Sequence, residues 1–123
     1  MQEDRDYLKC AVLCYGLLLD LEGSTSVAGL AKTFGFVNPC AGKSVDDLSR
    51  DIPLFVVRAG QDEIPHLNET IDRFLAKTLT RNLPITFANH PNAPHSFDVL
   101  HDSETSREII RQILAFMRFH LLA

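Results

Sequence analysis

Two polar residues follow apolar runs at positions from which they could act together in proton transfer. Asp62 comes three residues after the apolar run at 53–59, and His95 comes six residues after the run at 84–89. If these runs are adjacent parallel strands, both side chains reach the same edge of the sheet. A carboxylate beside an imidazole fixes its tautomer and stabilises the imidazolium that forms when the ring accepts a proton. Asp62 and His95 are therefore the candidate acid and base of a hydrolytic site.

Taken singly, each residue has a plainer interpretation. A loop aspartate or a loop histidine is more commonly an ordinary surface residue, because loops are polar and solvent-exposed. The hypothesis thus depends on the pair, on its order and on the strands before it. Pro94 and the loop that begins at Pro91 would restrict the motion of His95.

The nucleophile that such a pair would serve is not evident. The sequence contains neither Gly-x-Ser-x-Gly nor Gly-x-Cys-x-Gly, and Ser24 and Ser26 lack the flanking glycines. The order Cys14, Asp62, His95 is suggestive, but Cys14 lies in an apolar run that is expected to continue as a strand instead of turning sharply into a helix. We expect Cys14 to be a buried core thiol.

Other clusters of polar residues predict no site. Gly42-Lys43-Ser44 resembles the end of a phosphate-binding loop, but Val37 occupies the position of its first glycine, so we expect a turn followed by a helix cap. Further polar residues cluster with the candidate pair, and these are His66, His90, Asp98 and His101. None of them has the spacing of a known zinc signature, so we expect neither a metal nor a cofactor.

Composition narrows the class of protein. The chain has 123 residues, 46% hydrophobic and 23% charged, which predicts one globular domain spanning 1–123. Its net charge of −4 and lack of a basic run argue against a nucleic-acid partner. The longest apolar stretch, at 10–19, is about half of a membrane span, and the first residues are polar and unlike a signal peptide. We expect no membrane association.

The three cysteines bear on the compartment. Cys10, Cys14 and Cys40 leave one thiol unpaired in any disulfide scheme and fit no zinc motif. Reduced thiols are typical of the cytoplasm, so a cytoplasmic protein is predicted.

The elements that would position the pair follow from the apolar pattern. Runs at 9–18, 53–59 and 84–89 are continuously apolar, as in parallel strands with helices on both faces. An amphipathic helix lies between the second and third runs, with Pro65 in its first turn and Asn82 at its exit. Its expected apolar stripe consists of Leu67, Ile71, Phe74, Leu75, Thr78 and Leu79.

A second amphipathic helix is predicted to begin near Asp102 or Ser103. Its expected buried residues are Ile109, Ile110, Ile113, Leu114, Met117 and Leu121. A weaker helix is expected at 27–34, and Ser44 could cap a short helix that runs to Arg50. The predicted fold class is α/β, with three layers and a short parallel sheet of about three strands.

These segments resemble the C-terminal half of α/β-hydrolase-fold enzymes of the dienelactone hydrolase and esterase kind. The segments that carry the resemblance are Arg58-Ala59-Gly60-Gln61-Asp62-Glu63, Pro94-His95-Ser96-Phe97-Asp98 and Cys10-Ala11-Val12-Leu13-Cys14-Tyr15-Gly16. The resemblance implies that Asp62 is the triad acid, that His95 is the base, and that the three strands are the last three of the family sheet. It also implies that the nucleophile elbow would lie before Met1.

The resemblance implies an ester- or lactone-directed hydrolase that is inactive on its own. It also implies that the first strand, interior in the family, has a free edge that a second copy or a missing N-terminal half would cover. We therefore expect a homo-oligomer, most simply a homodimer. The alternative is a noncatalytic oligomerisation or interaction module derived from a hydrolase.

Overall fold

A parallel sheet of three strands forms the centre of the protein. The computed structural model describes residues 7–16, 26–38 and 41–123. Its strands are β1 (Ala11–Cys14), β2 (Leu54–Ala59) and β3 (Ile85–His90), in the spatial order β1-β2-β3. Leu13 pairs with Val56, and Val56 pairs with Phe87. The predicted parallel sheet is confirmed.

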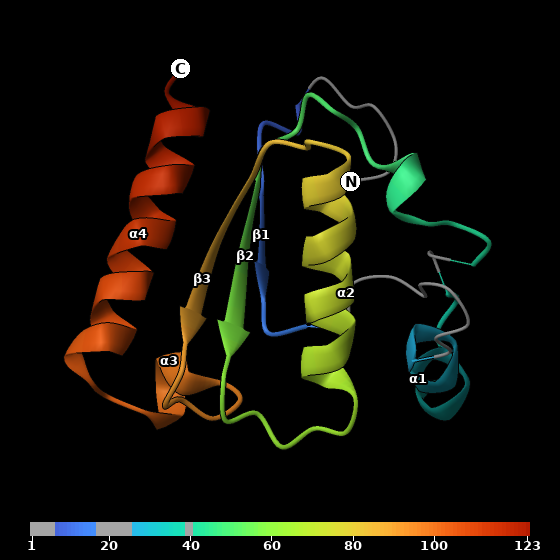
Figure 1. The fold of residues 1–123 in the computed structure, drawn as a ribbon, viewed down its shortest axis with the longest axis horizontal. Helices are drawn as coiled ribbons and strands as arrows, with labels where there is room; N and C mark the ends of the chain where they lie inside the picture. Colours follow the sequence, from blue (N-terminus) through green and yellow to red (C-terminus); the bar gives the residue numbers. More distant parts are fainter. Residues whose placement is uncertain (1–6, 17–25, 39–40) are drawn as a thin grey trace.

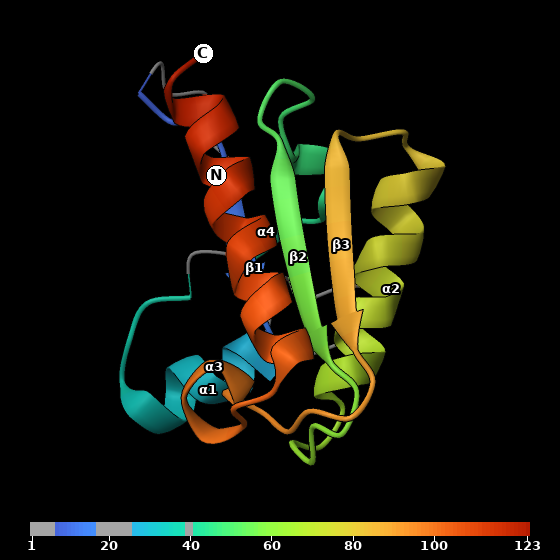
Figure 2. The same ribbon diagram turned by 90° about the vertical axis from the view of Figure 1, so that its left-hand side faces the viewer.

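Helices cover both faces of the sheet, which gives three layers (Figures 1 and 2). α2 (Leu67–Thr80) lies on one face, and α4 (Glu104–Leu121) lies on the other. Successive residues of β2 point to opposite faces, so Leu54 and Val56 enter the core on the α2 side while Phe55 and Val57 enter the core on the α4 side. All four are at most 3% exposed. This burial on both faces explains the continuous apolar run.

The first strand is shorter than predicted. It ends at Cys14, because Tyr15 has a φ of 34°, which interrupts the extended backbone. The predicted strand positions 17 and 18 lie outside the described residues. β2 and β3 each begin one residue later than the apolar runs that predicted them, after Pro53 and Pro84.

α2 buries most of the predicted stripe. Leu67, Ile71, Phe74, Leu75 and Thr78 are at most 8% exposed. Leu79 was wrongly placed in the stripe: it is 52% exposed, because it lies beyond the edge of the face that contacts the sheet. Asn82 takes a left-handed φ of 53° at the exit of the helix, as predicted. Pro65 was wrongly predicted in the first turn: the helix begins at Leu67 with His66 as its N-cap, so Pro65 precedes it.

α4 begins as predicted but buries less than predicted. Ser103 is its N-cap and accepts a hydrogen bond from the Ser106 backbone. Of the predicted buried residues, Ile109 is 4% exposed, and Ile110, Ile113 and Met117 are only partly buried. Leu114 and Leu121 are 59% and 56% exposed, so their prediction as core residues was wrong. An 18-residue helix spans about 27 Å, while a six-residue strand spans about 20 Å. The last turn of α4, which contains Leu121, therefore extends past the sheet. Leu114 lies on the side of the helix that faces solvent.

The remaining elements are short. α1 (Ser26–Phe34) agrees with the predicted weak helix, and η1 (Val45–Asp47) is a single turn that ends before the predicted Arg50. Ser44 caps η1 through a reciprocal capping box with Asp47, so the predicted turn and cap are confirmed. α3 (Phe97–Leu100) connects β3 to α4. Among the helices of the described residues, none combines the length and apolar character needed to cross a membrane.

Candidate functional site

The loops after β2 and β3 meet at the carboxyl end of the sheet (Figure 1). The Gly60 backbone N–H donates to the His90 carbonyl at 2.8 Å, and the Gln61 N–H donates to the Ala93 carbonyl at 2.9 Å. A Cβ atom at Gly60 would lie 2.7 Å from the carbonyl oxygen of Pro91, so only glycine allows this approach. The two loops are thus packed backbone to backbone, which fixes the positions of the side chains they carry.

This packing brings the two predicted site residues together. The Nδ1 atom of His95 lies 2.6 Å from Oδ2 of Asp62. An ionised carboxylate can only accept, so Nδ1 carries the shared proton. The Asp62 side chain is fully buried, whereas the His95 side chain is 39% exposed. Nε2 is then the imidazole nitrogen that remains for exchange of a proton with a reactant.

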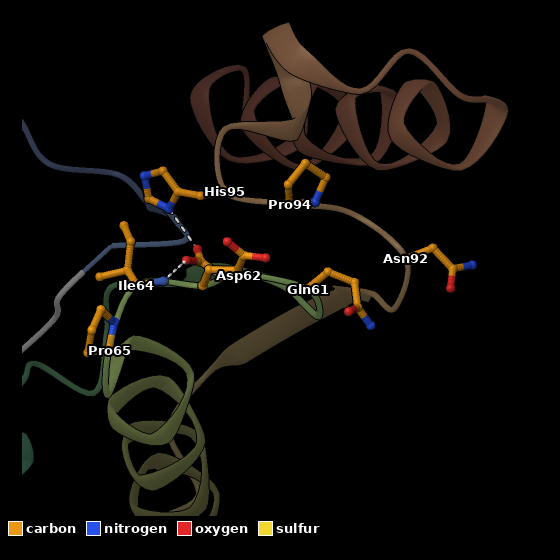
Figure 3. A pocket seen from close by; sticks show the side chains of 8 residues that line it. Gln61, Asp62, Ile64, Pro65, Asn92, Pro94 and His95 are labelled. Atoms are coloured by element: carbon orange, nitrogen blue, oxygen red, sulfur yellow. Dashed lines mark hydrogen bonds and ion pairs between the residues drawn. The ribbon is translucent and has the colours of Figure 1, made fainter.

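The second oxygen of Asp62 holds the carboxylate in place. Oδ1 accepts a hydrogen bond from the Ile64 backbone N–H at 3.0 Å, and the two dashed lines in Figure 3 mark both contacts of the carboxylate. The Asp62 backbone N–H also donates to the Ala59 carbonyl at 3.2 Å. A buried carboxylate that is bound at both oxygens has one orientation, and that orientation aims Oδ2 at the imidazole.

An open hollow lies beside the pair. Its volume is about 590 Å³, and it is lined by Gln61, Asp62, Glu63, Ile64, Pro65, Asn92, Pro94 and His95 (Figure 3). Glu63 supplies a carboxylate to this lining, which includes neither lysine nor arginine. The hollow can therefore admit a small molecule next to the imidazole, and its charge favours neutral or cationic molecules.

Tyr15 forms a second contact at His95 and is itself bound by Asp98, an arrangement that the sequence analysis did not assign. The Tyr15 ring meets the His95 ring edge to face, with centroids 5.0 Å apart, and its hydroxyl donates to Oδ1 of Asp98. Burial raises the pKa of Tyr15, and the hydrogen bond and charge of Asp98 raise it further, so the phenol keeps its proton. The only signal in the sequence was the position of Tyr15 at the end of an apolar run.

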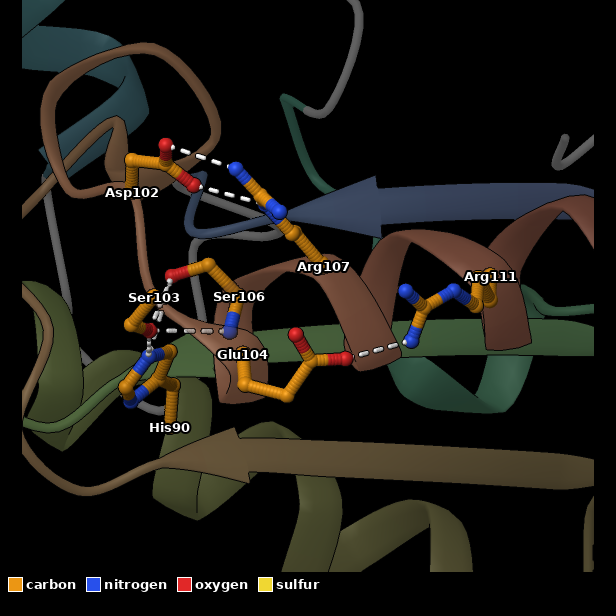
Figure 4. A network of polar contacts seen from close by, with 7 residues as sticks. All are labelled: His90, Asp102, Ser103, Glu104, Ser106, Arg107 and Arg111. Carbon is orange, nitrogen blue, oxygen red and sulfur yellow. Dashed lines mark hydrogen bonds and ion pairs between the residues drawn. The ribbon is translucent and has the colours of Figure 1, made fainter.

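His90 is not part of this site, although the sequence placed it beside His95. It ends β3 and is 2% exposed, with Nε2 at 3.2 Å from the Ser103 hydroxyl and 3.1 Å from the Ser106 hydroxyl (Figure 4). Nδ1 is buried without a hydrogen-bond partner among the described residues. Burial lowers the pKa of His90, and His101 lowers it further. This imidazole joins β3 to the start of α4.

The other candidates do not gather into a site. His66 is exposed at the N-cap of α2, and its Nδ1 atom lies 3.3 Å from Oε2 of Glu69. In the described part of the chain, no three residues among His, Cys, Asp and Glu are placed to hold a metal ion. Cys40 lies outside the described residues.

Cys14 is exposed at the end of β1 and is not the buried core thiol that the sequence predicted. Within the described residues β1 lies at the edge of the sheet, which explains the exposure. Although the residue is exposed, partial desolvation of its thiol raises the pKa of Cys14, and the nearby Asp98 carboxylate raises it further. Because the thiolate is the attacking species, this environment disfavours Cys14 as a nucleophile.

Comparisons with known proteins identify no relative: no family model, curated protein or solved structure matches the chain. The chemical capacity of the site therefore has to be judged from its geometry. The site holds an imidazole that is oriented through Nδ1, and its Nε2 atom is left for a reactant. Within the described residues no hydroxyl or thiol is hydrogen-bonded to His95. Such a site can accept a proton and return it to a leaving group.

Proposed function

We propose that this chain carries the acid–base half of a hydrolase that acts on small esters or lactones. Asp62 orients and stabilises His95, and His95 takes a proton from a nucleophile and later returns it to the leaving group. The observation that carries the proposal is the 2.6 Å contact between a fully buried carboxylate and a half-open imidazole. A contact that only stabilised the fold would not require the ring to face a hollow.

The attacking group comes from outside this sequence. The chain has no Gly-x-Ser-x-Gly motif, and the raised pKa of Cys14 disfavours its thiol. A serine or cysteine on an upstream segment or a separate chain would complete the triad, in keeping with the resemblance to the C-terminal half of α/β hydrolases. We therefore expect negligible esterase activity from the chain alone. The proposed setting is the cytoplasm.

A small external nucleophile tests this function. With p-nitrophenyl acetate, 2-mercaptoethanol can enter the hollow, lose its proton to His95 and attack the acyl carbon. p-Nitrophenolate then leaves, the acetyl thioester of 2-mercaptoethanol is released, and His95 returns its proton to the solvent. We expect a thiol-dependent rate that falls in His95→Ala by roughly 100-fold, the lower end for general-base catalysis. Asp62→Asn should also lower it.

The matched control is His66→Ala, which removes an imidazole that is 75% exposed on the adjacent helix. It should leave the thiol-dependent rate unchanged. An equal rate in native protein and His95→Ala would refute the proposed function. Turnover of the ester without added thiol, lost in His95→Ala, would instead refute the proposed need for an external nucleophile.

A second candidate function is a noncatalytic oligomerisation module, and the surface supplies an observation in its favour. Within the described residues β1 pairs only with β2, so its outer backbone edge is free to pair. Large apolar side chains are exposed along α4, namely Leu114, Phe119, Leu121 and Leu122. Light scattering at micromolar concentration should report a dimer under either candidate function. A sharply monomeric species would refute the oligomer, whereas thiol-dependent catalysis by His95 favours the hydrolase over the module.

A further inference from the structure

We propose that Tyr15 and Asp98 form a strap that holds the His95 ring against Asp62. The strap joins the end of β1 to α3, which begins two residues after His95. The description of His95 as a base rests on the proposed function, but the strap itself rests on contacts. Tyr15 is thus a positioning residue that acts through His95.

The Tyr15 backbone is anchored to the sheet. Its N–H donates to the Val57 carbonyl at 2.9 Å, which continues the β1–β2 ladder by one bond. The residue then turns with a φ of 34°, a conformation that side-chain-bearing residues seldom adopt. This turn ends the strand and directs the ring toward the loop that carries His95. Because the surrounding structure holds this backbone in an uncommon conformation, the position of the Tyr15 ring is restricted.

The Tyr15 ring contacts two aromatic rings of the segment that follows β3, those of His95 and Phe97. It meets His95 at a centroid distance of 5.0 Å and an interplanar angle of 66°, and it meets Phe97 at 5.6 Å and 67°. Phe97 is 2% exposed and belongs to the core on the α4 side. Edge-to-face contacts between aromatic rings are favourable and directional. The His95 ring is therefore bounded by Tyr15 in addition to its hydrogen bond with Asp62.

The hydroxyl of Tyr15 completes the strap. It donates to the Asp98 carboxylate, an exposed group on α3. Hydrogen bonds to a charged acceptor are stronger than neutral ones. Burial and Asp98 raise the pKa of Tyr15, which keeps the hydroxyl protonated and the strap closed at neutral and moderately alkaline pH. Without this bond, the His95 ring would still be held by Asp62 and by the Tyr15 ring, but the Tyr15 ring itself would lose its link to α3.

The test measures solvent exchange of the His95 Nδ1 proton by NMR of protein labelled with ¹⁵N in its histidine rings. This proton is shared with Asp62, so its exchange reports how often the ring leaves the carboxylate. Tyr15→Phe keeps the aromatic contacts and removes only the hydroxyl. We expect exchange to be faster by roughly tenfold or more in Tyr15→Phe and in Asp98→Asn, because tenfold is about the lower end for the loss of one hydrogen bond to a charged group. The double variant should match the single variants, because both changes break the same contact.

The chain offers matched controls. Tyr7→Phe and Asp51→Asn make the same chemical changes before β1 and before β2, at the opposite end of the strands, and should leave the exchange rate unchanged. Backbone amides of β3 give the internal reference. Native-like exchange in Tyr15→Phe would overturn the strap, as would equal acceleration of the β3 amides, which indicates general destabilisation. Failure of the thiol assay with an intact exchange effect would refute the proposed hydrolase function and leave the strap standing.

Discussion

His90 and His95 are five residues apart in the chain, yet they occupy opposite kinds of environment. His90 is 2% exposed and bonded to two serine hydroxyls. His95 has a side chain 39% exposed and is bonded to a carboxylate. A buried imidazole between neutral hydroxyls favours the uncharged ring. A half-open imidazole beside a carboxylate can take up a proton and release it.

The role of each imidazole therefore depends on its hydrogen-bond partner and on its exposure to solvent. His90 crosses between β3 and α4, and its loss would release the start of that helix (Figure 4). His95 contacts a loop aspartate and faces the hollow (Figure 3). The first site stabilises the fold and the second can do chemistry. Phe97 lies between them, because its ring contacts both His90 and the Tyr15 ring that bounds His95.

The largest expected effect comes from removal of this shared support. Phe97→Ala should lower the free energy of unfolding by about 3–5 kcal/mol, the cost of deleting a buried aromatic side chain. It should also disturb both imidazole sites. Urea unfolding followed by circular dichroism measures the change. Phe119→Ala, at a residue that is 72% exposed, should shift the free energy by less than about 0.5 kcal/mol, and equal losses in the two variants would contradict this account.

A smaller loss is expected at the buried histidine. His90→Ala removes the partner of the Ser103 and Ser106 hydroxyls and should cost about 1–3 kcal/mol in the same unfolding experiment. The thiol-dependent rate at His95 should persist in the fraction that stays folded. A stability equal to that of native protein would show that the serine contacts contribute nothing, and the contrast between the two sites would fail.

The smallest effect is the contribution of His90 to the pH dependence of stability. In the unfolded chain an imidazole titrates near pH ~6.5, and burial, together with His101, lowers the pKa of His90 in the folded protein. Below pH ~6.5 the unfolded chain therefore binds more protons, and stability falls as the pH is lowered, by at most about 1.4 kcal/mol per pH unit for one group. Above that pH the contribution of neutral His90 is fully present.

The pH effect is isolated by comparison of variants. His90→Gln keeps a polar side chain that does not titrate, so its unfolding free energy should fall less steeply than that of native protein between pH 6.5 and the acid range. Identical slopes in native protein and His90→Gln would refute the assignment of this titration to His90.

Much of the fold could be predicted from local pattern. Continuous apolar runs identified the strands, helical spacing identified α2 and α4, and Ser44, Asn82 and Ser103 marked helix ends. Errors arose where burial depends on distant elements. Leu79 and Leu114 have suitable spacing but lie beyond the surface that a three-strand sheet can cover.

The apolar pattern was enough to predict that Asp62 and His95 meet, because parallel strands bring the residues that follow them to one edge. Which histidine remains accessible to solvent depends instead on tertiary packing. α4 covers His90, Gly60 allows the His95 loop to settle on its neighbour, and Tyr15 crosses from β1 to bound the ring. Exposure and partner are set by elements far apart in the chain, and local spacing carries no information about them.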